Sequence, residues 1–380
     1  MPNSLTATRI DAAEVSATVV SHTPAVTAWA LRYFGPWWNA VDIPPPGDHD
    51  TASGPIVVAE VDSSRCADLA ARVTGSPHEE AVYARSPVLV CHGDDGSVHA
   101  FSQAEGLAYV AEPGSNRLLI VGSNEQPVNT AAARMAREAV RAVLHRMGWT
   151  LLHASAVVRD GRAVLAFGSK GSGKTTTALL LARYGGWELL ANDRIFVRPG
   201  PIGVQILPWP AAAAIGFGLL DALDLYDVAH DRVLVGEQLH PTQDDRVTAA
   251  LRVGHRSPLR ESDGRELKAQ VFPDQLRSWF GLRLATSGHA AVLLFPTVVS
   301  GASAARAEQC RSLAEGDFFS TKTEDRYPDI FGLARTDPAT RDHARVIVSE
   351  RLSRLPQHAV TLSHDIAANV DVLSKIVATV

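Results

Sequence analysis

The sequence predicts an α/β protein with three parts: a smaller, mainly β N-terminal domain over residues 1–127, an α/β domain over 128–300 and a helical extension over 301–380. Two observations predict this class. Residues 55–125 contain short apolar runs separated by turn residues, a pattern typical of strands. Residues 163–184 hold an apolar run, a glycine-rich loop and a helix-compatible stretch in that order, which is typical of an α/β sheet.

Composition and charge indicate an ordinary globular chain. Apolar residues make up 46% of the 380 residues and charged residues 20%, enough to bury more than one core. The net charge of −5 supplies no basic field, so we expect no nucleic-acid partner. Cys66, Cys91 and Cys310 lie far apart and fit reduced thiols. Without a signal-peptide pattern or an apolar run that could span a bilayer, we expect a cytoplasmic protein with no membrane partner.

The N-terminal domain is expected to consist mainly of short strands. The clearest strand candidates are residues 55–59, 87–91 and 117–121. Residues 92–96 have the composition of a hairpin turn, and the triple proline at 44–46 indicates a loop. We expect Trp37 and Trp38 to pack against a neighbouring surface, with ligand stacking as the alternative.

A helix is predicted between this domain and the next. Asn129-Thr130 has the composition of a helix cap, apolar residues follow at helical spacing over 131–147, and Gly148 ends the helix. Most arginines of the segment lie off the apolar stripe, namely Arg134, Arg137, Arg141 and Arg146. We expect them to form a solvated face; a surface for an acidic partner is the alternative.

The α/β domain is predicted from its strand candidates. These are residues 151–158, 163–167, 187–191, 194–198, 203–207 and 290–296. Asp160-Gly161 is a tight turn between the first two runs, and 194–198 and 203–207 form a hairpin. Residues 228–270 are polar and interrupted, and we expect a mobile excursion at 240–245.

Residues 168–175 read Gly-Ser-Lys-Gly-Ser-Gly-Lys-Thr and match the pattern G-x-x-x-x-G-K-[ST] completely. Glycines let backbone amides approach an anion, and the loop precedes a helix whose N-terminus favours negative charge. Lys174 can reach the β- and γ-phosphates, and the Thr175 hydroxyl can bind Mg²⁺. The alternative is an ordinary glycine-rich turn. We expect a nucleoside triphosphate to be bound by Gly168, Ser169, Lys170, Gly171, Ser172, Gly173, Lys174, Thr175 and Thr176.

Three polar residues at strand ends are the further candidates for chemistry. Asp193 follows the run 187–191, where a carboxylate can reach the Mg²⁺ that bridges the phosphates; a turn residue is the alternative. Asn192 can bind phosphate or a hydroxyl group but cannot act as a base. His153 is flanked by apolar residues, which indicates a core histidine. A role in proton or phosphate handling depends on the strand register.

His153, the loop 168–175 and Asn192-Asp193 together resemble the catalytic domain of HPr kinase/phosphorylase, over about residues 150–225. The resemblance implies a P-loop kinase core of the phosphoenolpyruvate carboxykinase type. That family has a histidine ahead of the loop and two adjacent aspartates after it, the first of which takes the proton from the target serine. Here Asn192 stands in that place. The family's second signature has Glu and Arg before Gly-x-Gly, where this sequence has Ala213 and Ile215, so the resemblance is to a divergent relative.

The resemblance implies an ATP- and Mg²⁺-dependent phosphotransferase that acts on a hydroxyl group, first of all a serine of a protein or peptide such as a natural-product precursor. Lys174 would hold the phosphates, Thr175 and Asp193 the Mg²⁺, and His153 and Asn192 the γ-phosphate and the incoming hydroxyl. Two alternatives stay open: a kinase for a small molecule on the same fold, and a nucleotide-sensing module that has lost catalysis. The sequence leaves open ATP versus GTP and the oligomeric state.

Overall fold

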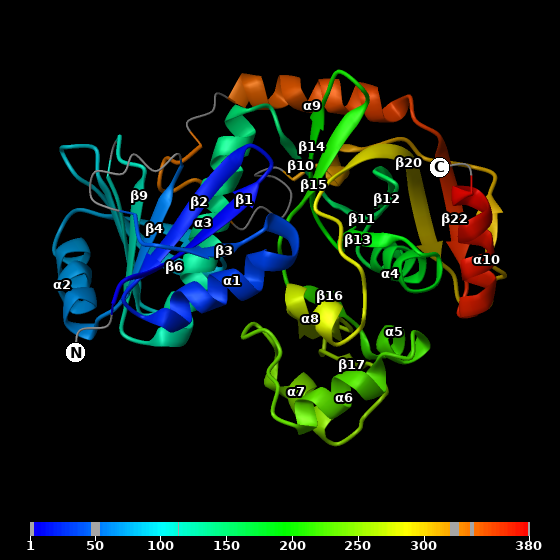
Figure 1. The fold of residues 1–380 in the computed structure, drawn as a ribbon, viewed down its shortest axis with the longest axis horizontal. Helices are drawn as coiled ribbons and strands as arrows, with labels where there is room; N and C mark the ends of the chain where they lie inside the picture. Colours follow the sequence, from blue (N-terminus) through cyan, green and yellow to red (C-terminus); the bar gives the residue numbers. More distant parts are fainter. Residues whose placement is uncertain (1–3, 47–53, 113, 320–326, 335–337, 379–380) are drawn as a thin grey trace. The chain divides into compact units, whose positions relative to one another are not determined.

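The chain folds into two compact units, each an α/β arrangement of one large sheet with helices (Figure 1). The residues that the computed structural model describes are 4–46, 54–112, 114–319, 327–334 and 338–378. Unit 1 comprises residues 1–148 and 320–341, and unit 2 comprises residues 149–319 and 342–380. The predicted α/β class is confirmed. Over the described ranges, no helix is both long and apolar enough to cross a bilayer.

Unit 1 is built on a mixed sheet that has nine strands among the described residues, in the order β3-β1-β2-β4-β9-β8-β7-β6-β5. The strands β2, β4 and β9 run parallel to one another, and the other pairs are antiparallel. Its elements are β1 (Thr6–Ala12), β2 (Val15–Ser21), α1 (Pro24–Trp38), β3 (Val41–Ile43), β4 (Ile56–Val61), α2 (Ser63–Thr74), β5 (Glu79–Tyr83), β6 (Ser86–His92), β7 (Val98–Ser102), β8 (Leu107–Ala111), β9 (Arg117–Gly122) and α3 (Glu125–Arg146).

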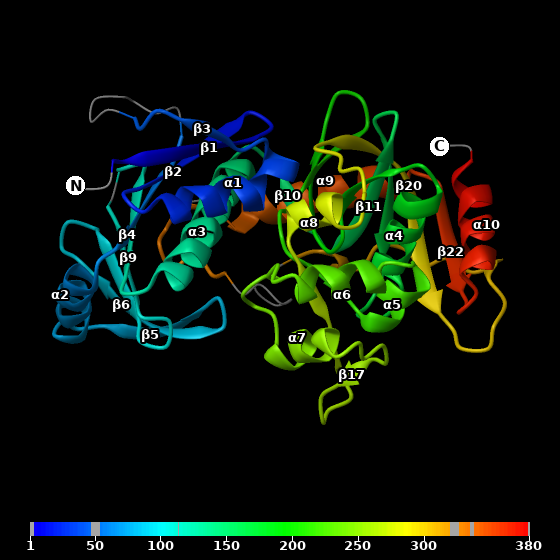
Figure 2. The same ribbon diagram turned by 60° about the horizontal axis from the view of Figure 1, so that its bottom comes forward.

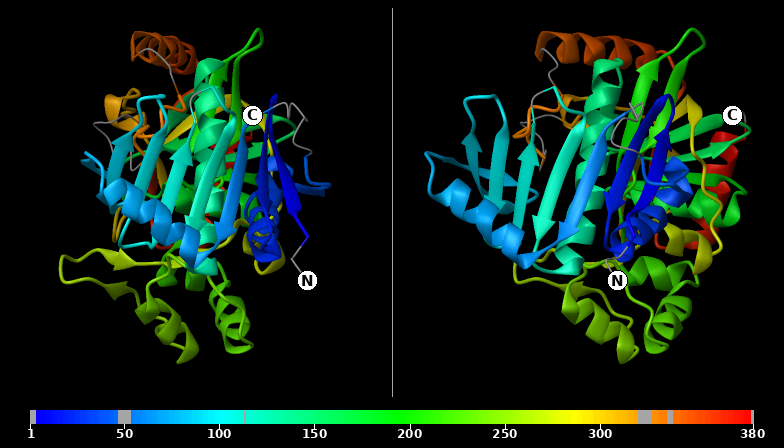
Figure 3. Two further views of the ribbon diagram at one scale, coloured as in Figure 1. Left: turned by 90° about the vertical axis from the view of Figure 1, so that its left-hand side faces the viewer. Right: turned by 60° about the vertical axis from the view of Figure 1, so that its left-hand side comes forward.

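Helices cover both faces of this sheet. Successive side chains of a strand point to opposite faces, and each face has side chains that pack on a helix. The paired residues Ala108 and Val121 face α2 and pack with its Cys66. The neighbouring Tyr109 points to the other face, where its hydroxyl accepts a hydrogen bond from Arg134 of α3 (2.7 Å). Figure 3 shows α2 lying across the strands, with α3 behind them.

Helix content is the main difference from the predicted N-terminal domain. Residues 24–38 form α1, which starts at a proline, a residue that the first helical turn tolerates. Trp37 and Trp38 are both 1% exposed, and Trp38 stacks on Phe34 with ring centroids 5.5 Å apart, so the packing expectation is confirmed. The strand candidates correspond to β4, β6 and β9, and the turn at 92–96 joins β6 to β7.

The α3 helix corrects two expectations. It begins at Glu125, with Asn124 as its cap, because Val128 in its first turns is already buried against the sheet. Two of its arginines are not part of a solvated face, since Arg134 is 9% exposed and Arg137 is 5% exposed, whereas Arg146 is exposed as expected. The helix is buried around most of its circumference, so side chains off the apolar stripe also lie inside unit 1.

Unit 2 is built on a second sheet, of the order β10-β14-β15-β20-β12-β11-β13, with β22 added to β20 and β21 added to β22. Its elements are β10 (Thr150–Leu152), β11 (Ala154–Arg159), β12 (Arg162–Phe167), α4 (Lys174–Tyr184), β13 (Glu188–Ala191), β14 (Ile195–Pro199), β15 (Val204–Pro208), β16 (Ala213–Ile215), α5 (Phe217–Ala222), α6 (Tyr226–Leu234), α7 (Asp245–Arg252), β17 (Leu259–Arg260), β18 (Glu266–Leu267), β19 (Ala269–Val271), α8 (Pro273–Ser278), β20 (Gly288–Val298), β21 (Ala305–Ala307), η1 (Glu315–Asp317), α9 (Pro338–Ser353), β22 (Gln357–Leu362) and α10 (Ile366–Val377).

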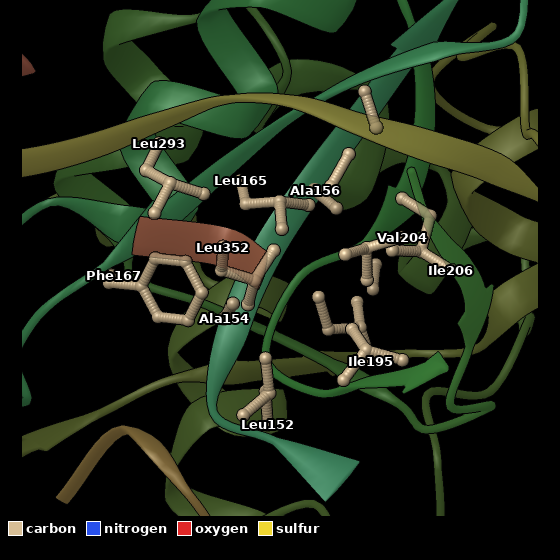
Figure 4. Packing of buried hydrophobic residues seen from close by; sticks show 14 of the residues in the cluster. Leu152, Ala154, Ala156, Leu165, Phe167, Ile195, Val204, Ile206, Leu293 and Leu352 are labelled. Carbon is tan, nitrogen blue, oxygen red and sulfur yellow. The ribbon is translucent and has the colours of Figure 1, made fainter. Parts of the chain in front are cut away.

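The strand β12 lies inside this sheet, between β11 and the parallel β20. On one face, Leu165 and Phe167 pack with Ala154 of β11 and Leu352 of α9 (Figure 4). On the other face lies α4, which also contacts α10 (Figures 1 and 2). Burial on both faces explains why the sequence of β12 is a continuous apolar run.

Unit 2 departs from the predicted elements in three places. The strand expected over 151–158 is divided at His153, where β10 pairs with β14 and β11 pairs with β12. The polar segment 228–270, for which the sequence predicts no helix, contains helical turns in α6 and α7. The segment 301–380 contributes β22 to the sheet, and Val348 of α9 is buried in the core, so this segment is not a separate helical extension. The predicted hairpin at 194–207 is confirmed as β14 and β15.

Candidate functional site

The loop between β12 and α4 has three glycines with positive φ, and two of them lie directly before the helix. Gly171 has a φ of +85°, and Gly173, which caps α4, has a φ of +105°. Residues other than glycine rarely adopt these angles. A Cβ atom on Gly173 would lie 2.9 Å from Leu362 Cδ1 and 3.0 Å from Val298 Cγ2. The backbone therefore passes closely over β20 and β22 before it enters the helix.

The first turn of α4 presents backbone amides without helical partners. Its first helical hydrogen bond runs from the Thr177 amide to the Gly173 carbonyl (2.8 Å). The amides of Lys174, Thr175 and Thr176 precede that bond, so they have no carbonyl one turn earlier to donate to. Together with the helix dipole, these amides make the N-terminus of α4 a site for an anion.

The Lys174 side chain folds back over the loop. It is 7% exposed, and its Nζ donates to the carbonyl oxygens of Gly168 (2.6 Å) and Ser169 (3.1 Å). The hydroxyls of Ser172 and Thr177 are buried and have no hydrogen-bond partner within the described part of the chain. Buried polar groups normally have partners, so these two hydroxyls fit a phosphate-binding loop.

Strand register brings His153 to the same place. Ala154 pairs with Phe167, the last residue of β12, so His153 lies beside the start of the loop. The strand β13 pairs with the other edge of β11 and ends at Ala191, which brings Asp193 to this end of the sheet. The Nε2 atom of His153 lies 2.9 Å from Oδ1 of Asp193. The register on which the role of His153 depended thus places it with the loop and Asp193.

The Asp193 carboxylate is surrounded by basic groups. Desolvation raises its pKa, but the hydrogen bond with His153 and the charges of Arg194 and Lys174 outweigh desolvation and lower the pKa to about 2. Asp193 is therefore ionised at neutral pH and is a weak base. Because an ionised carboxylate only accepts hydrogen bonds, Nε2 of His153 must be the donor, and Nδ1 is an acceptor whenever the imidazole is neutral.

The Asn192 backbone joins three elements of the site. Its carbonyl oxygen accepts hydrogen bonds from Ser155 Oγ of β11 (2.5 Å) and Thr175 Oγ1 of α4 (3.4 Å). Asn192 itself is buried, with 7% exposure. The hydrogen bond from Thr175 to the Asn192 carbonyl holds the Thr175 hydroxyl at the strand end that carries Asp193. A Mg²⁺ ion bound to nucleotide phosphates needs this arrangement.

Mg²⁺ here would depend on the nucleotide for most of its ligands. Across the described ranges, no group of three or more His, Cys, Asp and Glu side chains could hold a metal. That agrees with the chemistry of Mg²⁺, which usually takes one or two protein ligands together with phosphates and water. Thr175 and Asp193 fit this pattern. Lys170 has an exposed side chain and, within the described residues, makes no hydrogen bond or ion pair.

Sequence reasoning missed two residues that shape this site. Phe319 lies far along the chain, and its ring centroid is 5.2 Å from that of His153. No local pattern could have identified it. Ser155, which binds the Asn192 carbonyl, lies two residues after His153, so strand alternation could have indicated it. Ala213 and Ile215 of the second signature segment are both buried, with 1% exposure.

The chain matches no protein-family model and no curated protein.

Proposed function

We propose that this protein is an ATP- and Mg²⁺-dependent phosphotransferase that acts on a hydroxyl group, with a serine of a protein or peptide as the acceptor. The observation that carries the proposal is the meeting of the glycine loop, Lys174 and the His153–Asp193 pair at the N-terminus of α4. A P-loop kinase core of the HPr kinase and phosphoenolpyruvate carboxykinase type accounts for this order of elements. GTP would fit the same phosphate contacts.

Phosphate binding would be the work of the loop amides and Lys174. The Lys174 ammonium now donates to two loop carbonyls, and a triphosphate is a stronger acceptor for it because both partners are ionised. Thr175 and Asp193 would hold Mg²⁺, which when bound neutralises charge on the β- and γ-phosphates.

The base that accepts the proton of the incoming hydroxyl group would be His153. Asn192 has no basic side-chain group, and Asp193, with a pKa of about 2, accepts a proton poorly. Asp193 instead orients the His153 ring through Nε2, which leaves Nδ1 to accept the proton of the incoming hydroxyl. Phosphoryl transfer proceeds through a loose transition state, so positioning and charge neutralisation provide most of the acceleration and a modest base is enough.

The direct test is transfer from ATP labelled on its γ-phosphate to proteins, peptides and metabolites of a cell extract, separated by molecular mass. We expect label in a protein or peptide fraction, and loss of it in Lys174→Ala. Lys375→Ala is the control, because it removes an exposed lysine of the same unit that lies outside the loop, on α10. Label in the low-mass fraction would instead identify a small-molecule kinase. Transfer that survives Lys174→Ala would contradict the proposed mechanism.

A nucleotide-sensing module is the second candidate, favoured by one observation. Neither of the two residues at the strand end, Asn192 and Asp193, is an effective carboxylate base. A sensor would bind ATP and hydrolyse it only at the background rate in the presence of every acceptor fraction. Asn192→Asp adds a carboxylate at this position, and a large gain in transfer would indicate a kinase site that has lost a base.

A further inference from the structure

Arg194 is held in place from three sides. Its Nε atom lies 3.2 Å from Oδ2 of Asp193. The centre of its guanidinium group lies 4.2 Å from the ring centroid of Phe319 and 5.8 Å from that of Trp209. Only 12% of the side chain is exposed. These contacts fix the plane of the guanidinium group before any ligand binds.

The same contacts leave the terminal nitrogens available. The rings of Phe319 and Trp209 attract the cation without accepting conventional hydrogen bonds, and Asp193 contacts Nε. Among the described residues, no acceptor forms a hydrogen bond with Nη1 or Nη2 of Arg194. A planar pair of N–H donors matches the spacing of phosphate oxygens.

Arg194 also belongs to the phosphate site through Asp193. One oxygen of that carboxylate contacts His153 and the other contacts Arg194, while the charge of Lys174 acts on the same group. Lys174, Arg194 and Asp193 together carry a net charge of +1. The carboxylate thus neutralises only one of the two cations, and the site retains positive charge for an anion.

We propose that Arg194 donates hydrogen bonds to the terminal phosphoryl group of the nucleotide and neutralises its charge during transfer. This inference rests on the proposed function, because the site must hold a triphosphate. In the step, the acceptor oxygen forms a bond to the γ-phosphorus, the bond to the bridging oxygen breaks and the nucleoside diphosphate leaves with the electron pair. The hydroxyl proton passes to Nδ1 of His153, and Arg194 keeps its protons.

Comparison of ATP with ADP tests the inference by binding alone. A contact with the terminal phosphoryl group contributes to the affinity for ATP and not to that for ADP. We expect Arg194→Ala to weaken ATP binding about 10- to 100-fold, the range of a charge-assisted hydrogen bond, and to change ADP binding less than about twofold. Arg194→Lys keeps the charge without the paired donors and should give an intermediate loss of ATP affinity.

Arg198 provides the matched control. It lies on β14 in the same unit, and its guanidinium group lies 4.6 Å from the ring centroid of Trp149 and donates to Gln205 Oε1 (3.0 Å). Arg198→Ala therefore removes a stacked arginine outside the site, and both affinities should stay unchanged. Titrations in EDTA separate a direct contact from an effect through Asp193 and Mg²⁺, because the direct contact persists without the metal.

Each outcome decides between the proposals. Equal weakening of ATP and ADP, or an effect on ATP that vanishes in EDTA, would overturn the role of Arg194. If Arg194→Ala fails to fold, Arg194→Lys carries the same comparison. A selective loss of ATP affinity in a protein that transfers phosphate to no acceptor would support Arg194 as a γ-phosphate ligand and reject the phosphotransferase. Absence of ATP binding by the unaltered protein would overturn both.

Discussion

Alanine substitution at Gly171 and at Gly173, two of the three loop glycines with positive φ, should have unequal effects. At Gly171, φ is +85° and no atom lies within 4 Å of an added Cβ, so only backbone strain of about 1–2 kcal/mol is expected. At Gly173, φ is +105° and the Cβ would also press on Leu362 and Val298 at 2.9 and 3.0 Å. Displacing those methyl groups adds about 1–2 kcal/mol, for a total of roughly 2–4 kcal/mol.

Urea denaturation and nucleotide titration measure the two consequences. We expect Gly173→Ala to lower the free energy of unfolding by about 1–2 kcal/mol more than Gly171→Ala. The Gly173 variant should also lose more ATP affinity, because the added methyl shifts the cap of α4 and misaligns its first amides. Equal stabilities and equal affinities would refute the reasoning, since both positions have positive φ and the main difference between them is what surrounds the Cβ.

Three other substitutions test separate parts of the structure. Ser155→Ala removes a buried hydrogen bond to the Asn192 carbonyl, and urea denaturation should show a loss of about 1 kcal/mol; an unchanged midpoint would count against that bond. Arg134→Met removes the ion-pair partner of Glu105 in unit 1 and should cost about 2 kcal/mol, of which Glu105→Gln in the same chain restores part; no recovery would contradict the pairing. Asp193 has a pKa lowered from 3.8 to about 2, so its ionisation stabilises the fold above pH 4, and this contribution is lost as the pH falls through 2. The stability of the native protein relative to Asp193→Asn should therefore decline between pH 4 and pH 2, and a constant difference would show that the pKa is not lowered.

The local parts of the site could be predicted from the sequence. The strand before the loop, the loop itself and the hairpin after Asp193 are defined by short-range signals: an apolar run, glycine spacing and a proline-glycine turn. His153 was a candidate, but its role depended on the pairing of Ala154 with Phe167, which the sequence alone did not determine.

Long-range packing accounts for what the sequence could not reveal. Phe319 reaches His153 and Arg194 from a distant segment, and β22 joins the sheet beside β20 although its surroundings look helical. Arg134 and Arg137 of α3 resemble part of a solvated face because an isolated helix with that pattern would expose them. Their burial follows from the tertiary contacts of Arg134 with Glu105 and of Arg137 with Tyr33.

Calorimetric titration of the purified chain with ATP in Mg²⁺ tests the central claim most directly. If the amides at the start of α4 and the Lys174 ammonium bind a triphosphate, one nucleotide should bind per chain. Lys174→Ala should reduce the affinity at least about tenfold, while Lys375→Ala on α10 leaves it unchanged. If neither ATP nor GTP produces binding heat with the unaltered protein, or if Lys174→Ala binds as tightly as the unaltered protein, the account is contradicted.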